Sequence, residues 1–209
     1  MEVVRGKDIT IRFDSAKCIH SRYCVTGAPT LFVGNVEGDW IFPDAVPVED
    51  SVRIAWACPS GAIAYERHDG GPQEEAPPVN IVRLQENGPL AFRANLTING
   101  QPAGYRATLC RCGKSKTKPF CDHSHVEAGF LATSEPATKS EEALAVRDGV
   151  LAITPTKDGP LQVEGNLEIC TGTGRVIEKT VKTWLCRCGA SANKPFCDGT
   201  HKKIGFTAP

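Results

Sequence analysis

The chain has 209 residues, 41% of them apolar, enough to bury the core of one large domain or of two to three small ones. Its 24 basic residues balance its 24 acidic ones, so overall charge gives no reason to expect binding to nucleic acid or to an anionic membrane. No apolar run approaches the ~20 residues that span a bilayer, and the first residues lack the apolar core of a signal peptide. We therefore expect a cytoplasmic protein without a membrane segment.

Residues 1–70 predict a small domain of mixed α and β structure. Ile9, Ile11 and Phe13 alternate with polar residues as in a half-buried strand. Residues 50–57 have helical character, with Asp50 as the expected cap. The following residues 71–79 are rich in proline, glycine and acidic side chains, and we expect them to form a linker.

The first of three cysteine groups lies in this N-terminal domain. Cys18 and Cys24 lie close together, and Cys58, which precedes a proline, follows much later in the chain. The pattern resembles that of single-cluster bacterial ferredoxins, in which two cysteines of a tight loop and a distant Cys-Pro hold a cubane-type cluster. Ser21 stands where the four-cysteine pattern has its middle ligand. The resemblance implies a [3Fe-4S] cluster, or a [4Fe-4S] cluster whose fourth iron takes His20, Ser21 or water. Ordinary buried thiols are the alternative.

Beyond the linker the sequence repeats itself. Gly88-Pro-Leu recurs as Gly159-Pro-Leu, and the stretch from Cys110 recurs from Cys186. The offset between the copies is larger at the second of these landmarks than at the first, so the second copy contains a short insertion. We place the first copy at residues 80–132 and the second at 150–209, with residues 133–149 as their connector.

Both copies predict strands. The segments 90–98 and 161–169 alternate apolar and polar residues, and 105–109 and 181–185 are strand-like runs that lead into the next cysteines. Each copy is marginal alone, so we expect the two to pack about a pseudo-twofold axis into one β domain, with Trp184 in its core. The whole chain is then an α+β protein, a monomer with an internal pseudo-dimer.

Each copy carries one cysteine and histidine motif. Cys-Arg-Cys is followed by eight residues, a third cysteine, three residues and a histidine, with the same spacing in both copies. The candidate metal ligands are Cys110, Cys112, Cys121 and His125 in the first copy and Cys186, Cys188, Cys197 and His201 in the second. Cys-x-Cys turns two thiolates toward one metal, and Cys-x3-His sets a thiolate and an imidazole one helical turn apart.

Four other residues of the motif are candidates for cofactor binding. Arg111 and Arg187, each between two ligands, can add positive charge or hydrogen bonds near the thiolates. Asp122 and Asp198 follow the third cysteine, where a short helix would begin and need an N-cap. Such a helix would point its amides at an anionic cluster.

The two motifs resemble the CDGSH iron-sulfur domain, also called the NEET family. The resemblance covers residues 80–131 and 151–207 and implies a [2Fe-2S] cluster in each copy. In the first copy it implies that Cys110 and Cys112 bind one iron and that Cys121 and His125 bind the other. Cys186, Cys188, Cys197 and His201 repeat the arrangement. A structural zinc site is the alternative, although its ligands are usually paired as Cys-x2-4-Cys.

Two features stand outside these patterns. His123 replaces the glycine of the family motif beside the first cluster, and we expect it to be a neighbour of His125 and not a ligand. Cys170 stands alone among the ten cysteines, which suit metal ligation better than disulfides in a chain without an export signal. We expect Cys170 to be a small core or surface residue.

The leading functional hypothesis is a non-enzymatic protein for single-electron transfer. No phosphate-binding loop, nucleotide fingerprint or activated nucleophile is found in the sequence. The alternatives are a [2Fe-2S] store or donor and an electron-feeding subunit of a separate oxidoreductase. The expected partners are redox proteins or apo-protein cluster acceptors.

Overall fold

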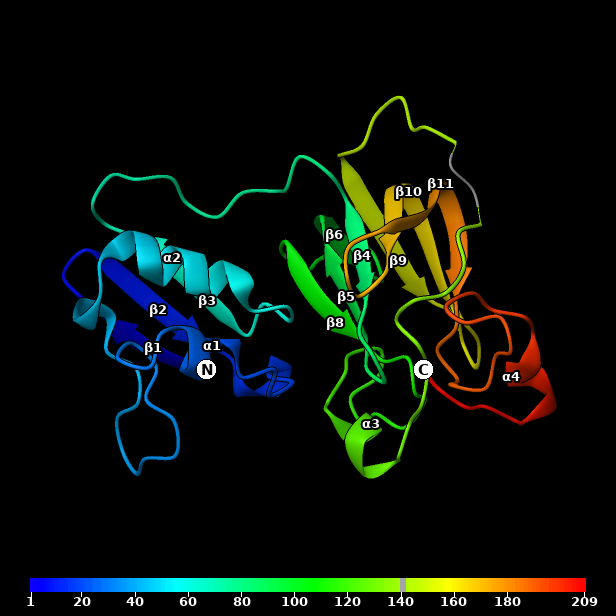
Figure 1. Ribbon diagram of the computed structural model, residues 1–209, viewed down its shortest axis with the longest axis horizontal. Coiled ribbons are helices and arrows are strands. Elements are labelled where there is room, and N and C mark those ends of the chain that lie inside the picture. Colours follow the sequence, from blue (N-terminus) through cyan, green and yellow to red (C-terminus); the bar gives the residue numbers. More distant parts are fainter. Residues whose placement is uncertain (140–141) are drawn as a thin grey trace. The chain divides into compact units, whose positions relative to one another are not determined.

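The computed structural model describes residues 1–139 and 142–209 and divides into two compact units, Met1–Glu75 and Ala76–Pro209. The division falls within residues 71–79, which the sequence marks as a linker. Among the described residues, no helix combines the length and the apolar character needed to cross a membrane. Of the predicted connector 133–149, residues 140 and 141 lie outside the description. Figure 1 shows the elements of each unit.

Unit 1 is a three-stranded antiparallel sheet packed against helices. The sheet has the order β1-β2-β3, with β1 at Glu2–Arg5, β2 at Ile9–Phe13 and β3 at Ile63–Arg67. The helices are α1 at Tyr23–Gly27, α2 at Val48–Ala57 and the 3-10 turns Ser15–Lys17 and Pro43–Ala45. Ile9 and Ile11 are buried, as the alternation predicts, and pack with Leu31, Phe32 and Ile54.

The C-terminal end of α2 fixes the position of Cys58. The helix begins at Val48 after Pro47, so the prediction that Asp50 is the cap is wrong; Asp50 lies in the first turn, where its charge favours the helix dipole. The helix ends at Ala57 because Pro59 disfavours helical geometry at the residue before it. Cys58 is therefore placed at the C-terminal end of α2.

Unit 2 contains a single eight-stranded sheet and two short helices. The path along the sheet is β7-β6-β9-β10-β4-β5-β8, with β11 paired to β10. The first repeat supplies β4 (Ile81–Leu84), β5 (Leu90–Arg93), β6 (Asn95–Ile98), β7 (Gln101–Pro102), β8 (Arg106–Leu109) and helix α3 (Ser124–Glu127). The second supplies β9 (Val150–Pro155), β10 (Leu161–Cys170), β11 (Val176–Leu185) and helix α4 (Thr200–Lys203).

The two repeats exchange their first strands. β9 runs parallel to β6 of the first repeat with Thr97 opposite Ala152, and β4 runs parallel to β10 of the second with Glu168 opposite Ile81. These are equivalent pairs, because Thr97 corresponds to Glu168, and Ile81 to Ala152, in the same register that relates the two Gly-Pro-Leu segments. The expected pseudo-twofold arrangement is confirmed, and each repeat needs a strand of the other to complete its part of the sheet.

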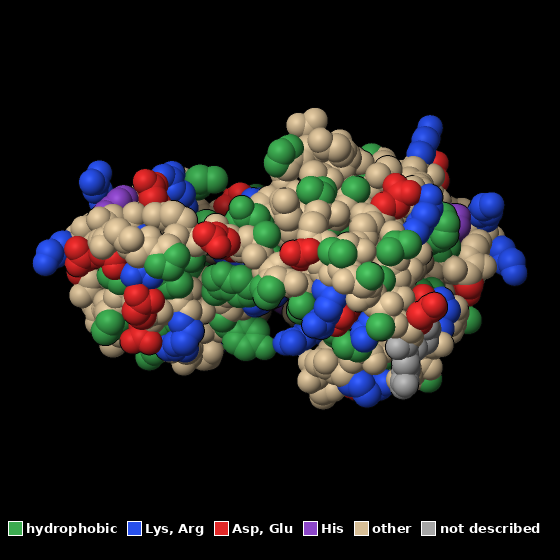
Figure 2. All heavy atoms as spheres, turned by 90° about the horizontal axis from the view of Figure 1, so that it is seen from above, with side chains coloured by type: hydrophobic (Ala, Val, Ile, Leu, Met, Phe, Trp, Pro, Cys, Tyr) green, Lys and Arg blue, Asp and Glu red, His purple; other side chains and the backbone are tan. Residues whose placement is uncertain are grey.

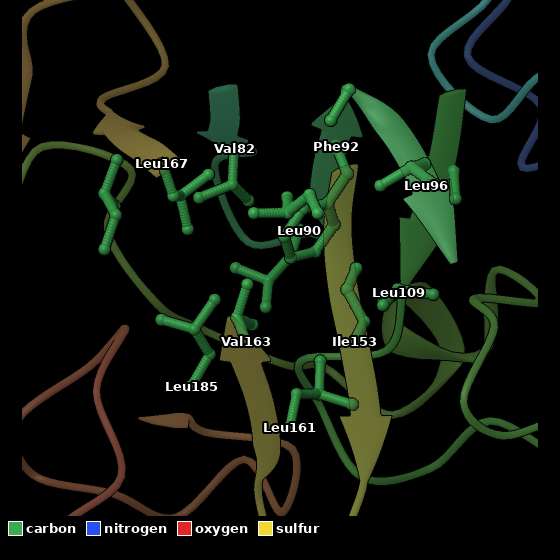
Figure 3. Close-up of a cluster of buried hydrophobic side chains, with 14 of the residues drawn as sticks. Val82, Leu90, Phe92, Leu96, Leu109, Ile153, Leu161, Val163, Leu167 and Leu185 are labelled. Carbon is green, nitrogen blue, oxygen red and sulfur yellow. The ribbon is translucent and has the colours of Figure 1, made fainter. Parts of the chain in front are cut away.

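The core of unit 2 is shared by both repeats. Leu90, Phe92 and Leu109 pack in one cluster with Leu161 and Val163 of the second repeat (Figure 3). Each such side chain contributes about 1.5–3 kcal/mol when it leaves water. The strands β8 and β11, which lead into the two cysteine-containing loops, therefore share one continuous core.

The repeats differ in two local features. The segment 90–98, predicted as one strand, is broken at Ala94 into β5 and β6, whereas β10 continues through a register shift between Glu164 and Leu167. Gly165 lies at that shift with φ +121°, and a Cβ there would lie 2.5 Å from the carbonyl oxygen of Val150. The insertion of the second repeat lengthens the hairpin between β10 and β11.

Candidate metal centres

The first metal loop, residues 110–125, begins where β8 ends. Leu109 is fully buried and anchors the start of the loop, and the amide of Cys110 donates to the carbonyl of Pro119 at 2.8 Å. The Sγ atoms of Cys110 and Cys112 lie 3.7 Å apart. Two sulfurs held at about 2.3 Å by one tetrahedral metal lie about 3.8 Å apart, so the pair fits a shared iron.

The other two predicted ligands of this loop form a second pair. The amide of Cys121 donates to the carbonyl of Thr108, a residue of β8, at 3.0 Å. His125 lies in α3, and its Nδ1 is 3.5 Å from the Sγ of Cys121. The structure therefore joins Cys121 to His125, as predicted, through the ring nitrogen nearer the backbone.

The second metal loop, residues 186–201, repeats this geometry. Cys186 and Cys188 are 3.7 Å apart at Sγ, and the Sγ of Cys197 lies 3.4 Å from Nδ1 of His201. The amide of Cys197 donates to the carbonyl of Trp184 at 2.9 Å. Two loops that differ in their intervening residues thus place the same four side chains in the same two pairs.

The pairing distinguishes two kinds of metal site. In the part of the chain that the structure describes, no three His, Cys, Asp or Glu side chains gather around one point as a single metal ion requires. A structural zinc ion would need all four ligands of a loop around it. Each loop brings its four candidate ligands together as two close pairs, which a cluster with two irons can bridge.

Hydrogen bonds shift the pKa values of the first thiol pair, Cys110 and Cys112. The thiol of Cys112 and the backbone amides of Ser115, Gly113 and Cys112 lower the pKa of Cys110 to about 6, against the opposing effect of burial. The same contact with Cys110, together with burial, raises the pKa of Cys112. One thiolate of the pair is thus available at neutral pH. Burial raises the pKa of Cys121 to about 11.

His123 is a neighbour of the ligand pair. It is the N-cap of α3 with φ 73°, a left-handed conformation that suits the Gly199 found at the equivalent position, where φ is 84°. The rings of His123 and His125 meet edge to face with centroids 5.0 Å apart. Burial, and then the charge of His123, lowers the pKa of His125, which keeps that ring neutral and able to bind metal.

Asp122 and Asp198 hold the metal loops together. Each lies one residue before the cap position, which His123 or Gly199 occupies, so the prediction that these aspartates are N-caps is wrong. Asp122 accepts the amide of Ser124 at 3.0 Å and the amide of Lys116 at 2.8 Å. Asp198 binds the amides of Thr200 and Ala192 in the same way. The carboxylates bridge the two halves of each loop.

Arg111 anchors the first loop from behind. Its side chain is 1% exposed, although a guanidinium is costly to bury. Its nitrogens donate at 2.6–3.2 Å to the carbonyl oxygens of Gln85, Gly88, Ala132 and Thr133. The predicted hydrogen bonds to the thiolates are therefore replaced by bonds to the backbone.

The charge of each arginine reaches the other repeat. Burial lowers the pKa of Arg111 to about 10, which leaves it charged at neutral pH, and the nearby thiols that oppose this shift include Cys186 and Cys112. Arg187 donates to the carbonyls of Gly159, Pro209 and Thr156, and its charge acts on Cys110. The predicted addition of positive charge near the thiolates thus holds, partly across the pseudo-twofold axis.

The two metal loops touch each other. A Cβ on Gly113 would lie 2.6 Å from the carbonyl oxygen of Cys188, and one on Gly189 would lie 2.5 Å from that of Cys112. Both glycines have positive φ, 78° and 83°. Only glycine allows this reciprocal backbone contact, which sequence spacing alone does not reveal.

The N-terminal cysteines surround one cavity. Cys18, Cys24 and Cys58 all line a cavity of about 420 Å³ in unit 1, together with His20 and Ser21. Three thiols are donors that suit a cubane-type cluster, and His20 and Ser21 are two of the three predicted alternatives for its fourth ligand, water being the third. Burial is the main cause that raises the pKa of Cys18 and of Cys24.

Ser60 is a further wall residue of the cavity that the cysteine pattern did not single out. It is buried, and its Oγ lies 3.6 Å from the Sγ of Cys58. It also accepts the amide of Ala62 at 3.3 Å. The feature of the sequence that could have identified Ser60 is its position directly after Cys58-Pro59.

The remaining predictions concern residues outside the three sites. All ten cysteines are described and none forms a disulfide. Cys170 is buried at the end of β10, with Sγ 3.9 Å from the carbonyl of Glu168, which agrees with the prediction of a small core residue. Trp184 is 45% exposed, so its predicted place in the core is wrong: it faces outward on β11 while Leu185 faces inward.

Comparison with known proteins agrees with this geometry. A family model described as "Iron-binding zinc finger CDGSH type" matches residues 80–126 and 158–202, and a model described as "Divergent 4Fe-4S mono-cluster" matches residues 4–68. Two proteins named Uncharacterized protein YjdI, from Escherichia coli K12 and O157:H7, are each 44% identical over 64 residues. That match covers 30% of this chain and 80% of each relative.

The fold and the paired ligands define an iron-sulfur protein of α+β structure. The chain belongs to the CDGSH iron-sulfur family, in a form that joins two tandem repeats to an N-terminal divergent 4Fe-4S mono-cluster domain.

Proposed function

We propose that this protein transfers single electrons through three clusters: a [2Fe-2S] cluster in each metal loop and a [3Fe-4S] or [4Fe-4S] cluster in the cavity of unit 1. The observation that carries the proposal is the reciprocal contact of the two metal loops, Gly113 on Cys188 and Gly189 on Cys112. This backbone contact between the two candidate metal loops supports the exchange of electrons between the clusters that we propose for them.

Iron-sulfur clusters take up and release electrons one at a time. The chain supplies each site of unit 2 with three thiols and one imidazole, so the ligand set carries one negative charge less than a set of four thiolates. Replacing thiolate by imidazole raises the reduction potential in the Rieske centres, and buried Arg111 and Arg187 act in the same direction by attracting negative charge.

Rigid surroundings favour such a role. Each arginine is fixed by several backbone carbonyls, and each aspartate by two amides, so the loops change little when charge is added or removed. We propose a non-enzymatic, monomeric, cytoplasmic carrier whose partners are other redox proteins.

A second candidate is donation of [2Fe-2S] clusters to apo-proteins. It is favoured by the partial exposure of Cys188 and Cys197, whereas their equivalents Cys112 and Cys121 are buried. A cluster that leaves the protein must pass through such an opening. This candidate differs from electron transfer in the fate of the iron.

One experiment separates the candidates. The chemically reduced protein is mixed with an oxidised flavoprotein and, separately, with an apo-ferredoxin, and iron is then measured in each separated protein. Electron transfer predicts reduction of the flavin with all iron retained. Movement of iron and colour to the apo-ferredoxin, without flavin reduction, would overturn the electron-transfer proposal in favour of donation.

A further inference from the structure

The two metal loops have different surroundings. Cys112 is 7% exposed and Cys121 3% exposed, whereas both equivalents in the second loop, Cys188 and Cys197, are partly exposed. In addition, the ring of His123 packs against His125, and the second loop has only Gly199 at that position. The second site is therefore the more open of two otherwise equal sites.

The residues around the second metal loop also differ in chemistry from those around the first. The strand residue whose carbonyl binds the third cysteine is buried Thr108 in the first repeat and exposed Trp184 in the second. Exposed aromatic side chains of this kind are frequent anchors of protein interfaces. Trp184 exposes 45% of its surface, and Lys182 of the same strand lies over its ring, 5.5 Å from the ring centroid.

The helices beside the histidines differ in charge. After His125, helix α3 continues with Val126 and Glu127; after His201, helix α4 continues with Lys202 and Lys203, both exposed. Exposed Ile204 follows them, where the first repeat has an alanine, but Val126 of α3 is exposed as well, so the two helices differ in charge and not in apolar exposure. Lys202 and Lys203 lie in the last turn of α4. On the face of the molecule drawn in Figure 2, by contrast, lysine and arginine side chains are interspersed with aspartate and glutamate.

We propose that the second metal loop is the site of unit 2 at which a partner protein docks, and that this partner has an acidic surface. In this proposal, which rests on the proposed electron transfer, Trp184 and Ile204 supply apolar contact and Lys202 and Lys203 attract the partner's carboxylates. One electron passes from the second site to the partner, or the reverse, and the first site exchanges electrons only through the second.

The first repeat offers a matched control. Lys114 and Lys116 are also exposed and lie in the first metal loop, at the positions of Ala190 and Ala192 in the second. Replacing either pair of lysines by glutamates changes the net charge of the protein by the same amount. A difference between the two variants therefore reports the place of docking and not the overall charge.

The test uses the full-length, cluster-loaded protein and an acidic flavodoxin as the probe. We expect Lys202→Glu/Lys203→Glu to lower the rate of flavodoxin reduction at low ionic strength about tenfold or more, and the difference to shrink as salt is added. Lys114→Glu/Lys116→Glu should change it by less than about twofold. Equal losses in both variants, or a larger loss in the Lys114 and Lys116 variant, would overturn the proposal.

Affinity gives a second measurement that does not depend on electron transfer. Binding of the oxidised protein to flavodoxin should weaken in Trp184→Ala at every salt concentration, with Val181→Ala, another exposed apolar position on β11, as the control. If both variants bind like the wild type, the docking surface is wrongly placed. If binding follows the prediction but no flavin is reduced, the docking site stands and electron transfer fails.

Discussion

At the scale of single residues, we propose that His125 and His201 set the charge of each site as ligands. Nδ1 of His125 and of His201 lies 3.5 and 3.4 Å from the thiol of its partner cysteine. Changing both histidines to cysteine should leave the clusters bound but each more negative by one charge, and redox titration followed by EPR should show both reduction potentials falling.

The same double variant should alter the dependence on pH. A histidine ligand is lost when its ring takes up a proton, and burial, followed by the charge of His123, lowers the pKa of His125. Acid should therefore promote release of the first cluster only as the pH falls below the ordinary pKa of histidine. Thiolate ligands remove that step, and loss of visible absorbance in this range should be slower. His123→Ala should have much less effect; release of the cluster by His123→Ala but not by His125→Ala would show that the ligand is misassigned.

Arg111 provides a test of the support behind the ligands. Arg111→Lys keeps the charge but not the planar set of donors that reaches four carbonyl groups. Leaving several of these buried acceptors unsatisfied should lower the stability of unit 2 by about 2–3 kcal/mol. Urea unfolding monitored by circular dichroism measures this, with exposed Arg53→Lys as control, and an unchanged midpoint would contradict the account.

At the scale of structural elements, the contact between the metal loops predicts that one substitution affects both clusters. Gly113→Ala places a Cβ against the backbone of Cys188 and also strains a residue with φ 78°. We expect accelerated loss of iron from both loops, measured as the decay of visible absorbance.

Gly104→Ala is the matched control for this prediction. Gly104 has φ 75° and open space around its Cβ position, so the substitution adds about 1 kcal/mol of backbone strain and no clash. If the two variants lose iron at the same rate, the contact between the loops has no role in holding the clusters.

The elements also show what sequence can and cannot predict. The alternation in 161–169 predicts β10, and the fixed spacing predicts which thiol pairs with His125, because both patterns are local. The break at Ala94 and the contact of Gly113 with Cys188 depend on strands of the other repeat, so neither is visible in local periodicity. The carbonyl partners of Arg111 come from segments far away in the sequence, so the sequence predicts its charge near the thiolates but not its bonds to the backbone.

At the scale of the whole molecule, the division into two units and the exchange of strands predict which parts fold alone. A chain that starts near Pro77 contains all of unit 2 except its first residue and should run as a monomer with both [2Fe-2S] clusters. Loss of both clusters on removal of unit 1 would refute this boundary.

Deletion of the second repeat, by contrast, should not leave a folded first repeat. Removing residues 150–209 takes away β10, the partner of β4, and β9, the partner of β6. The first repeat should then lose its cluster as well, although all four of its predicted ligands remain. Size-exclusion chromatography and iron analysis of this truncated chain measure the effect, and retention of a stable cluster would show that a repeat folds independently.

All three proposed cluster sites depend on the identity of the metal that they bind. The most direct measurement is quantitative analysis of iron, zinc and acid-labile sulfide in full-length protein purified without oxygen. Two irons in each metal loop and three or four in the cavity of unit 1 predict about seven to eight irons per chain, with about eight acid-labile sulfides and visible colour. Stoichiometric zinc in a colourless protein would contradict this prediction.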